Sequence, residues 1–439
     1  MIKVVKFGGS SLSCGENFLK VKDIVQADPA RCIVVVSAPG KRRSDDNKVT
    51  DLLYTCHAHI RYKVPYDDIW ENIASRYREI ASTCGLRQDI NAELSAVRES
   101  MTRQSTVDYI VSRGEFLNAK LMAECLGYEF VDATRWLFFD FNGRVDYEKS
   151  YATLAQILES SPRVVLPGFY GALPDGNVHV FSRGGSDVTG ALAAAAVNAE
   201  SYENWTDVSG ILMADPRIVE NPRPIERITF SELRELSYMG AEVLHEETVF
   251  PVRQKNIPLY IKNTNDPAAK GTLIMEDFPD ENDDEGKRFI TGITGKKHYT
   301  IITLSKNRMT DDISFVRRVL QLTEKYHLTV EHIPSSVDSF SLVIASSSLE
   351  HCLHSLISDI RQECTPDSIK VCDGVSLIAV VGRRMAANAG VSGKIFETIG
   401  RMGINIRMIE QGSDEINIII GVMDSDFART IRTLYSSFT

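Results

Sequence analysis

"IKVVKFGGSSLSCGENFLKVKDIVQADPARCIVVVSA", residues 2–38, contains two apolar runs with a helical pattern between them. Residues 2–7 and 31–38 are rich in valine and isoleucine, which is typical of β-strands. Residues 17–27 carry apolar side chains at a spacing of three to four, which predicts a helix that covers the strands. Because residues 31–38 are apolar on both faces, we predict a central parallel strand. The whole stretch therefore predicts a βαβ unit of an α/β domain.

Residues 8–11, Gly-Gly-Ser-Ser, connect the first predicted strand to the helix. Glycines allow backbone N–H groups to approach an anion closely, and the positive end of the following helix adds to the attraction. Lys6 lies just before them and could place its charge on a transferred phosphoryl group. The P-loop motif G-x-x-x-x-G-K-[ST] does not occur in the sequence. Alone, the segment fits either a turn that ends a strand or a phosphate-binding loop.

The bulk composition excludes several classes of protein. A length of 439 residues predicts two or three domains, and the net charge of −10 argues against a non-specific nucleic-acid binder. No apolar run approaches the roughly 20 residues needed to cross a bilayer, and the N-terminal residues lack the pattern of a signal peptide. The 8 cysteines form no C-x-x-C pair, which argues against a disulfide framework or a zinc site. We expect a protein of the reducing cytoplasm.

The C-terminal part of the chain repeats one pattern twice. Residues 257–264 predict the last strand of the α/β domain, and the acidic stretch that follows at 275–288 is typical of a solvated linker. Each repeat then reads β-α-β-β and ends in a helix, which predicts paired small-molecule-binding modules. The predicted strands of the repeats are 299–307, 328–335 and 340–346, then 375–385, 404–411 and 415–423. The predicted bounds are 1–275 for the α/β domain, 276–289 for the linker, and 290–370 and 371–439 for the two small domains.

Two polar segments in the first half of the chain have both a plain and a functional interpretation. Ser37 lies at the end of the strand at 31–38, and the polar loop after it carries Thr50. Residues 112–115, "SRGE", place Glu115 at the head of a predicted helix, where the helix dipole favours a carboxylate. The plain interpretation is a solvated loop and a helix-end carboxylate. In the functional interpretation Glu115 binds a substrate ammonium.

"FSRGGSDVTGALAAAA", residues 181–196, indicates a site more specifically. Ser186 and Asp187 are predicted to cap an alanine-rich helix, which explains one of the two but neither Arg183 nor the glycines before them. An arginine beside flexible backbone at a helix start is suited to binding a carboxylate. Residues 205–217, "WTDVSGILMADPR", then place polar side chains at the end of a strand, where α/β sheets bind ligands.

Together and in this order, these segments resemble the aspartate kinases of the amino-acid kinase family. The resemblance covers essentially the whole chain, and the C-terminal repeats resemble ACT domains. It implies an α/β fold, a three-layer α/β/α sandwich followed by two ferredoxin-like domains. The segments that carry it are KFGGSS (6–11), VSA (36–38), GE (114–115), PGFYG (167–171), RGGSD (183–187), WTDVSGI (205–211), ADPR (214–217) and VLHEETVFPVRQKNIPLYIKNT (243–264).

The resemblance implies transfer of the γ-phosphoryl group of ATP to the side-chain carboxylate of L-aspartate, which gives 4-phospho-L-aspartate. This reaction opens the synthesis of lysine, threonine, methionine and isoleucine, and an end product (lysine, threonine or both) is expected to inhibit it. Mg²⁺ is expected as a cofactor held largely by phosphates and water, so no protein ligand is named. ACT domains commonly pair edge strands across subunits, so we expect a homodimer or homotetramer.

The resemblance also implies roles for individual residues. Lys6 and Asp187 would be catalytic: Lys6 would bridge the transferring phosphoryl group, and Asp187 would orient Lys6 and the acceptor. The aspartate pocket would consist of Ser37, Thr50, Glu115, Phe169, Arg183 and Ser186, with Glu115 on the ammonium and Arg183 on the α-carboxylate. The nucleotide would contact Lys6, Gly8, Gly9, Ser10, Gly184, Gly185, Thr206, Asp207, Leu212, Asp215 and Arg217. The effector would contact Met309, Asp312, Val330, Glu331 and Ser336, although Met309 and Val330 also fit ordinary core positions.

Three positions depart from the pattern of the aspartate kinases. Many members have an aromatic residue where Leu212 stands, beside the adenine, and a lysine where Glu242 stands, near the nucleotide phosphates. Ser182 replaces a common glycine. Leu212 and Glu242 leave open the alternative of a non-catalytic amino-acid sensor that binds ATP poorly. A kinase for another acidic amino acid is a further alternative. Because the charged residues assigned above to catalysis and aspartate binding are all present, activity is still expected.

Overall fold

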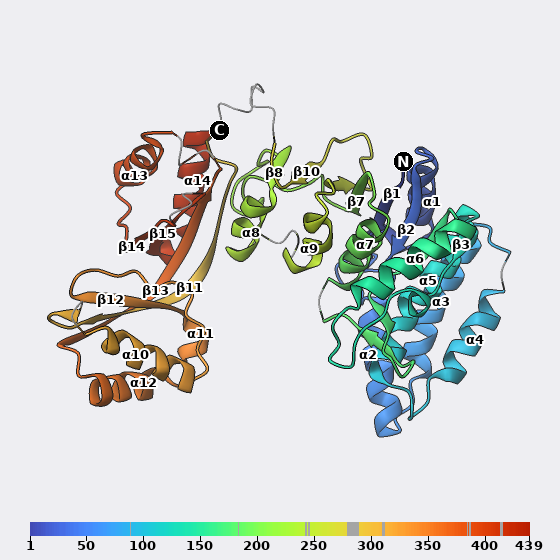
Figure 1. Ribbon diagram of the computed structural model, residues 1–439, viewed down its shortest axis with the longest axis horizontal. Helices are drawn as coiled ribbons and strands as arrows, with labels where there is room; N and C mark the ends of the chain where they lie inside the picture. The colour runs from blue at the N-terminus through green and yellow to red at the C-terminus, as the bar shows by residue number, and fades with distance from the viewer. Residues whose placement is uncertain are drawn as a thin grey trace. The chain divides into compact units, whose positions relative to one another are not determined.

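The structure is a computed structural model (Figure 1) that describes the chain except for residues 88, 183, 242–243, 245, 279–288, 310–311, 384, 386–387 and 413–415 and the side chains of 246 and 247. Contacts divide the chain into two compact units. The first comprises Met1–Ile211, Pro224–Phe230 and Val243–Phe278, and the second comprises Leu212–Arg223, Ser231–Glu242 and Pro279–Thr439.

The first unit is built on an eight-stranded sheet in which all neighbours are parallel except one pair. Across the sheet the strands are β3 (Glu129–Phe130), β4 (Val164–Pro167), β2 (Arg31–Val36), β1 (Lys3–Phe7), β7 (Ser201–Thr206), β9 (Leu259–Asn263), β10 (Thr272–Met275) and β8 (Arg227–Thr229). The predicted central strand is confirmed, because β2 lies between β4 and β1, parallel to both, and Ile33–Val36 are fully buried. A separate hairpin consists of β5 (Tyr170–Ala172) and β6 (Val178–Val180).

Helices cover both faces of this sheet, which confirms the predicted α/β/α sandwich. One layer contains α1 (Gly15–Gln26), α2 (Val49–Tyr62), α3 (Asp67–Thr83), α4 (Ile90–Ser100) and α5 (Val107–Leu126), and the other contains α6 (Tyr147–Ser160), α7 (Gly185–Ala196) and α9 (Glu246–Gln254). Successive side chains of a strand point to opposite faces. Val5 and Phe7 accordingly join the core under the first layer, whereas Lys6 points toward α7.

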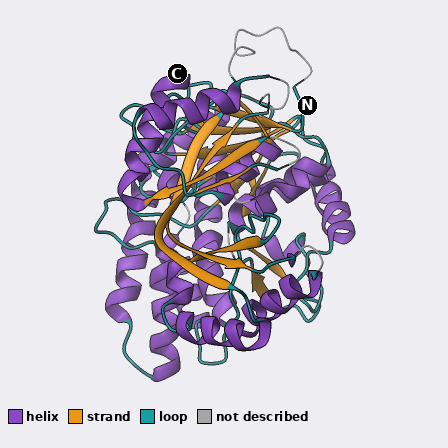
Figure 2. Cartoon of the chain, turned by 90° about the vertical axis from the view of Figure 1, so that its left-hand side faces the viewer, coloured by secondary structure: helices purple, strands orange, loops and turns teal. Residues whose placement is uncertain are grey.

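The second unit has a five-stranded antiparallel sheet in the order β12 (Ser339–Ala345), β11 (Gly292–Ser305), β13 (Ser368–Val381), β15 (Asn417–Met423) and β14 (Met408–Glu410). Its helices are α8 (Phe230–Tyr238, apart from its first residue), α10 (Ile313–Lys325), α11 (Ser346–Leu349), α12 (Leu353–Asp359), α13 (Val391–Arg401) and α14 (Phe427–Phe438). The two long strands, β11 and β13, pair along both of their halves, so the two repeats share one sheet; curved strands of this unit face the viewer in Figure 2.

Three predicted strands differ from the observed ones. Residues 328–335 make only isolated bridges to β12, because Pro334 has no N–H to donate to a ladder. Of residues 404–411, only Met408–Glu410 form a strand. Residues 257–264 contain β9 but not the last strand of the α/β sheet, since β10 follows and pairs antiparallel to it. Among the described residues, no helix has the length and apolarity needed to span a membrane.

A buried arginine fixes the loop that follows β2. The Arg76 side chain on α3 has no exposed surface, forms an ion pair with Asp46, and donates to the carbonyl oxygens of Gly40 at 3.1 Å and Asn47 at 2.7 Å. Because this loop leads to Thr50 at the start of α2, Arg76 also fixes the approach to the predicted aspartate pocket.

We predict that Arg76→Met destabilises the first unit by about 2–4 kcal/mol, because Asp46 keeps only its pair with Arg42 and the carbonyls of Gly40 and Asn47 lose this donor. Urea unfolding followed by tryptophan fluorescence measures the loss. Arg43→Met is the control: its ion pair with Asp45 joins side chains that are 78% and 73% exposed, so a change below about 0.5 kcal/mol is expected. Equal effects of the two substitutions would contradict the prediction.

Candidate active site

A buried ion pair lies between β1 and α7. The Lys6 ammonium is 2.7 Å from Oδ1 of Asp187, and Lys6 as a whole is 7% exposed. The predicted capping by Ser186 or Asp187 is wrong, because Gly184 is the N-cap residue, with φ of 55°, and no side chain caps the helix. Asp187 instead directs its carboxylate from the first turn of α7 to Lys6. A buried ammonium without a counter-charge costs more free energy than a helix end without a side-chain cap.

Sequence reasoning missed Asn204, which completes this pair. Its Oδ1 accepts a hydrogen bond from the Lys6 ammonium at 3.3 Å, and its Nδ2 donates to Oδ1 of Asp187 at 2.7 Å. Asn204 is 4% exposed and lies opposite Lys6 in the parallel pairing of β1 with β7. A polar residue inside an otherwise buried strand was the signal that could have identified it.

The glycine-rich turn after β1 touches the loop after β2. The Gly40 N–H donates to the Gly9 carbonyl at 2.8 Å, and a Cβ on Gly9 would approach the Ala38 carbonyl oxygen to 2.8 Å. The Gly8 N–H already donates to the Trp205 carbonyl at 3.0 Å. Within the part of the chain that the structure describes, the amides of Gly9 and Ser10 form no such backbone hydrogen bond.

Glu115 lies in the middle of α5 and not at its head, so that prediction is wrong. The helix begins at Val107, where Thr106 caps it, and runs through Gly114. This glycine is required by close packing, since a Cβ there would lie 2.9 Å from the Cβ of Ala38. A tertiary contact of this kind leaves no signal in the local sequence, so "SRGE" by itself favours a helix start.

The Glu115 carboxyl group is buried without a counter-ion among the described residues. Its Oε1 accepts from the Ala38 N–H at 3.1 Å, and its Oε2 has no hydrogen-bond partner. Burial raises the pKa of Glu115 to about 8. One turn further on, Asn118 donates to the Ser37 carbonyl at 2.6 Å, which holds α5 against the end of β2. An unpartnered acid at this place is suited to a cationic ligand.

Phe169 has a strained backbone beside the start of α7. Its φ of 80° is an outlier for a bulky residue. The conformation is held by a hydrogen bond from its N–H to the Thr189 hydroxyl at 3.1 Å, and a Cβ on Gly185 would lie 2.9 Å from its Cα. A Cβ on Gly168 would lie 2.6 Å from the Cβ of Ser186, so these two residues also pack closely. Phe169 and Ser186 therefore come together, whereas Arg183 is outside the described residues.

The residues predicted to hold the nucleotide belong to both units. Thr206 ends β7 and donates to Asp207 at 3.1 Å in the first unit. Leu212, Asp215 and Arg217 belong to the second unit, where Arg217 forms an ion pair with Asp215 at 2.8 Å. Glu242 lies outside the described residues. The described residues contain no group of three or more His, Cys, Asp or Glu that could hold a metal ion.

The predicted effector residues lie in the first repeat of the second unit. Met309 belongs to its hydrophobic core, and Val330 packs against that core. The Asp312 carboxylate is 3.4 Å from the nitrogen atoms of both Lys306 and Arg318.

Glu331 and Ser336 lie on the segment beside β12. Glu331 donates its N–H to the Val343 carbonyl, and Ser336 forms a turn with Ser339. Burial and the neighbouring Glu331 carboxylate raise the pKa of Tyr238, the last residue of α8. The Glu331 side chain is therefore directed toward α8.

The chain is similar to known proteins both in sequence and in structure. The profile of the Amino acid kinase family matches residues 1–263, and that of the ACT domain matches residues 378–438. The chain is 35% identical to aspartokinase 3 of Bacillus subtilis, a match that covers 100% of this chain and 98% of that protein.

Two solved structures cover the whole chain. The aspartate kinase of Clostridium acetobutylicum has a TM-score of 0.92 and 46% identity, with 100% of both chains covered. Escherichia coli aspartokinase III, solved with aspartate and ADP, has a TM-score of 0.74 and 26% identity over 100% of this chain and 99% of that one. Its complex with lysine and aspartate gives 0.75 and 25% over the same shares. The resemblance found in the sequence is confirmed, and the chain belongs to the amino acid kinase family, among its aspartokinases.

Proposed function

We propose that the protein transfers the γ-phosphoryl group of ATP to the side-chain carboxylate of L-aspartate and so forms 4-phospho-L-aspartate. The buried pair of Lys6 and Asp187 beside the glycine-rich turn carries this proposal, because phosphoryl transfer depends on positioning and charge neutralisation. The B. subtilis relative, named an aspartokinase, and the E. coli neighbour, solved with aspartate and ADP, support the same substrates. An intact ion pair also argues against the alternative of a non-catalytic sensor.

Lys6 supplies the positive charge that follows the transferring phosphoryl group. A Cβ on Gly8 would lie 3.6 Å from the Lys6 ammonium, so the charge lies directly beside the glycine-rich turn. The amides of Gly9 and Ser10 and the N-terminal end of α7 add donors and a positive dipole around the same place. Preorganised positive groups of this kind stabilise the charge that develops on the phosphoryl oxygens.

Aspartate is proposed to bind between β2, α5 and the start of α7. Glu115 takes the α-ammonium, and Ser37, Thr50, Phe169 and Ser186 surround the rest of the substrate, with Arg183 on the α-carboxylate. The unpartnered Oε2 of Glu115 supports this orientation, since a buried carboxyl oxygen without a donor is costly unless a ligand supplies one. The strained Phe169 supports it as well, because strain of this kind concentrates at ligand sites.

Within the first unit, ATP is proposed to contact Thr206 and Asp207, with Gly184 and Gly185 near its terminal phosphates. Mg²⁺ is proposed as an ion held mainly by ATP phosphates and water, because Mg²⁺ retains several waters when it binds. When bound, it neutralises phosphate charge.

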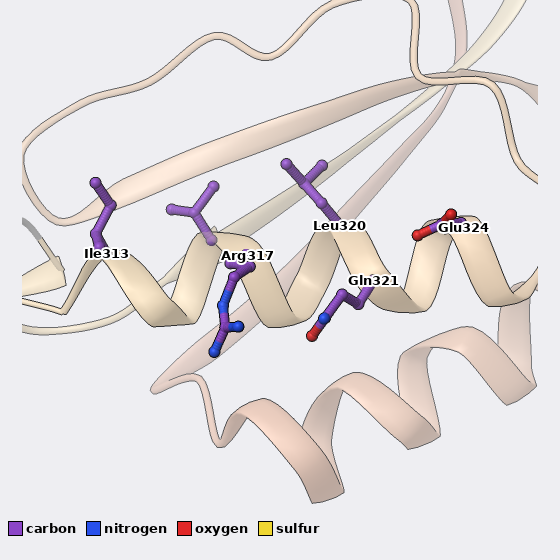
Figure 3. Close-up of a pocket in the computed structure, with 6 residues that line it drawn as sticks. Ile313, Arg317, Leu320, Gln321 and Glu324 are labelled. Carbon is purple, nitrogen blue, oxygen red and sulfur yellow. The ribbon is translucent and has the colours of Figure 1, made fainter.

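The ACT repeats are proposed to bind an inhibitory amino acid and to join two copies of the chain. A relative solved with lysine supports the first part. For the second, Ile313 is 84% exposed at the start of α10, and it lines an open pocket with Val316, Leu320 and three polar side chains of the same helix (Figure 3). An exposed helix face that carries apolar side chains is suited to a second copy of this chain.

Replacing Lys6 tests the activity itself. In an assay with ATP, Mg²⁺ and L-aspartate, hydroxylamine traps the acyl phosphate that the wild-type protein forms. Lys6→Met removes the charge on the phosphoryl group and is expected to lower kcat by about 10²–10³-fold. Lys3→Met on the same strand removes only a surface pair with Asp28 and leaves kcat unchanged. A wild-type protein that yields no hydroxamate would overturn the proposed function.

The pH dependence of aspartate binding follows from the raised pKa of Glu115. Because this pKa is about 8, the carboxyl group is mostly protonated at neutral pH in the free protein and must ionise to bind an ammonium. The KM for aspartate should therefore rise about tenfold for each pH unit below 8. Glu115→Gln should bind aspartate weakly and without this dependence. A wild-type KM that stays constant between pH 6 and pH 8 is the contrary result.

Glu331→Ala is expected to weaken inhibition while kcat stays within about twofold of the wild-type value. Loss of a hydrogen bond to the effector ammonium should raise the half-inhibitory concentration by about 10–100-fold. Activity is titrated with lysine and threonine, singly and together, which also identifies the effector. Glu350→Ala, an exposed carboxylate in the same repeat and outside the pocket on α10, serves as the matched control. An inhibition curve unchanged by Glu331→Ala would remove Glu331 from the effector site.

A further inference from the structure

We propose that Asn204 is a positioning residue for phosphoryl transfer, whose amide holds the Lys6 ammonium and the Asp187 carboxylate in one fixed arrangement. The inference rests on the function proposed above for Lys6 and Asp187. An isolated lysine–aspartate pair has no fixed geometry, because either carboxylate oxygen can accept from any ammonium proton. The structure places a third group at 3.3 Å from the ammonium and 2.7 Å from the carboxylate, and that group removes this freedom.

The chemistry of an amide matches both partners. It offers an oxygen that accepts and a nitrogen that donates, whereas a carboxylate only accepts and an ammonium only donates. In this site the amide oxygen faces the ammonium and the amide nitrogen faces the carboxylate. A leucine of similar volume could fill the space but could bond neither group. The position is therefore specific in polarity as well as in size.

For Lys6, the Asn204 amide determines which side of the ammonium keeps a proton without a partner. An ammonium has three protons, and Asp187 and Asn204 take two of them. The glycine-rich turn lies on the remaining side, since a Cβ on Gly8 would be 3.6 Å from the nitrogen. The third proton is thus left for a phosphoryl oxygen at that turn.

For Asp187, the amide fixes which oxygen serves which partner. Oδ1 receives both Lys6 and Asn204, while a Cβ on Gly184 would lie 3.6 Å from Oδ2. Oδ2 is therefore directed to the turn that begins α7. Without the amide, the carboxylate could rotate to bind the ammonium with both oxygens and draw it away from the phosphoryl group.

Tyr202 serves as the comparison for Asn204, because its role near the ion pair is purely structural. It lies two residues earlier on the same face of β7, is fully buried, and donates its hydroxyl to the backbone oxygen of Asp187 at 3.1 Å. It therefore supports the same residue without touching either charged group. Tyr202→Phe removes a buried hydrogen bond and leaves the arrangement of Lys6 and Asp187 intact.

The test measures kcat and both KM values of the full chain between pH 6 and pH 8.5, at saturating aspartate for kcat. Asn204→Leu should lower kcat by about 10–100-fold, the effect of lost hydrogen bonds to charged groups, and leave KM for aspartate and ATP within about threefold. Asn204→Asp should be impaired at high pH, where the introduced carboxylate repels Asp187. It should recover toward the wild-type kcat as the pH falls, because the protonated group can again donate to Asp187 and accept from Lys6.

The kcat of each variant is expressed as a ratio to the wild-type value at the same pH. For Tyr202→Phe this ratio should be constant with pH, with only a lower melting temperature. A constant ratio for Asn204→Asp, or an Asn204→Leu protein with unchanged kcat, would overturn the inference while the proposed function stands. If Asn204→Leu does not fold, the pH dependence of the kcat ratio of Asn204→Asp is sufficient to test the inference. An inactive wild-type chain would overturn the proposed function, and this inference with it.

Discussion

The buried charge of Lys6 is the constraint around which the first unit is arranged. An ammonium on the inward face of a buried strand is costly unless it is paired and hydrogen-bonded. The parallel register of β1 with β7 brings Asn204 opposite Lys6, and α7 packs across both strands so that Asp187 reaches the same place. Tyr202 holds the backbone of Asp187 from the same strand face. Sheet register, helix position and ion pair therefore depend on one another.

Glu115 represents the opposite arrangement of a buried charge. The fold satisfies one oxygen with the Ala38 N–H and leaves the other without a partner among the described residues, so burial keeps the group protonated. The Lys6 charge is paired before any ligand binds, whereas the Glu115 carboxyl stays protonated and ionises when an ammonium binds. This difference fits their proposed tasks. The charge that stabilises a transferring phosphoryl group has to be positioned before the reaction, whereas an unpartnered carboxyl oxygen favours a ligand that supplies a hydrogen-bond donor.

The sequence predicted the elements whose signals are local. The valine-rich strands, the helix at 17–27 and the helices of both repeats have periodic apolar residues, and the structure contains them. The errors arose where a tertiary contact decided the outcome. Gly114 lies inside α5, where it packs closely against Ala38, and Gly184 is the N-cap of α7, where Asp187 pairs with Lys6 in place of capping the helix. Asn204 was not predicted for the same reason, because its role depends on contacts with Lys6 and Asp187, which are not its neighbours in the sequence.

Within the second unit, α8 is the helix that both repeats hold. Glu331 of the first repeat lies beside Tyr238 at its end, while Arg383 of the second repeat donates its N–H to Glu232 near its start at 3.0 Å. An effector ammonium at Glu331 would compete with Tyr238 for the same carboxylate, so its binding would change the contact between the first repeat and α8. Because Glu232 near the start of α8 also accepts from Arg383, the same helix would carry that change to the second repeat.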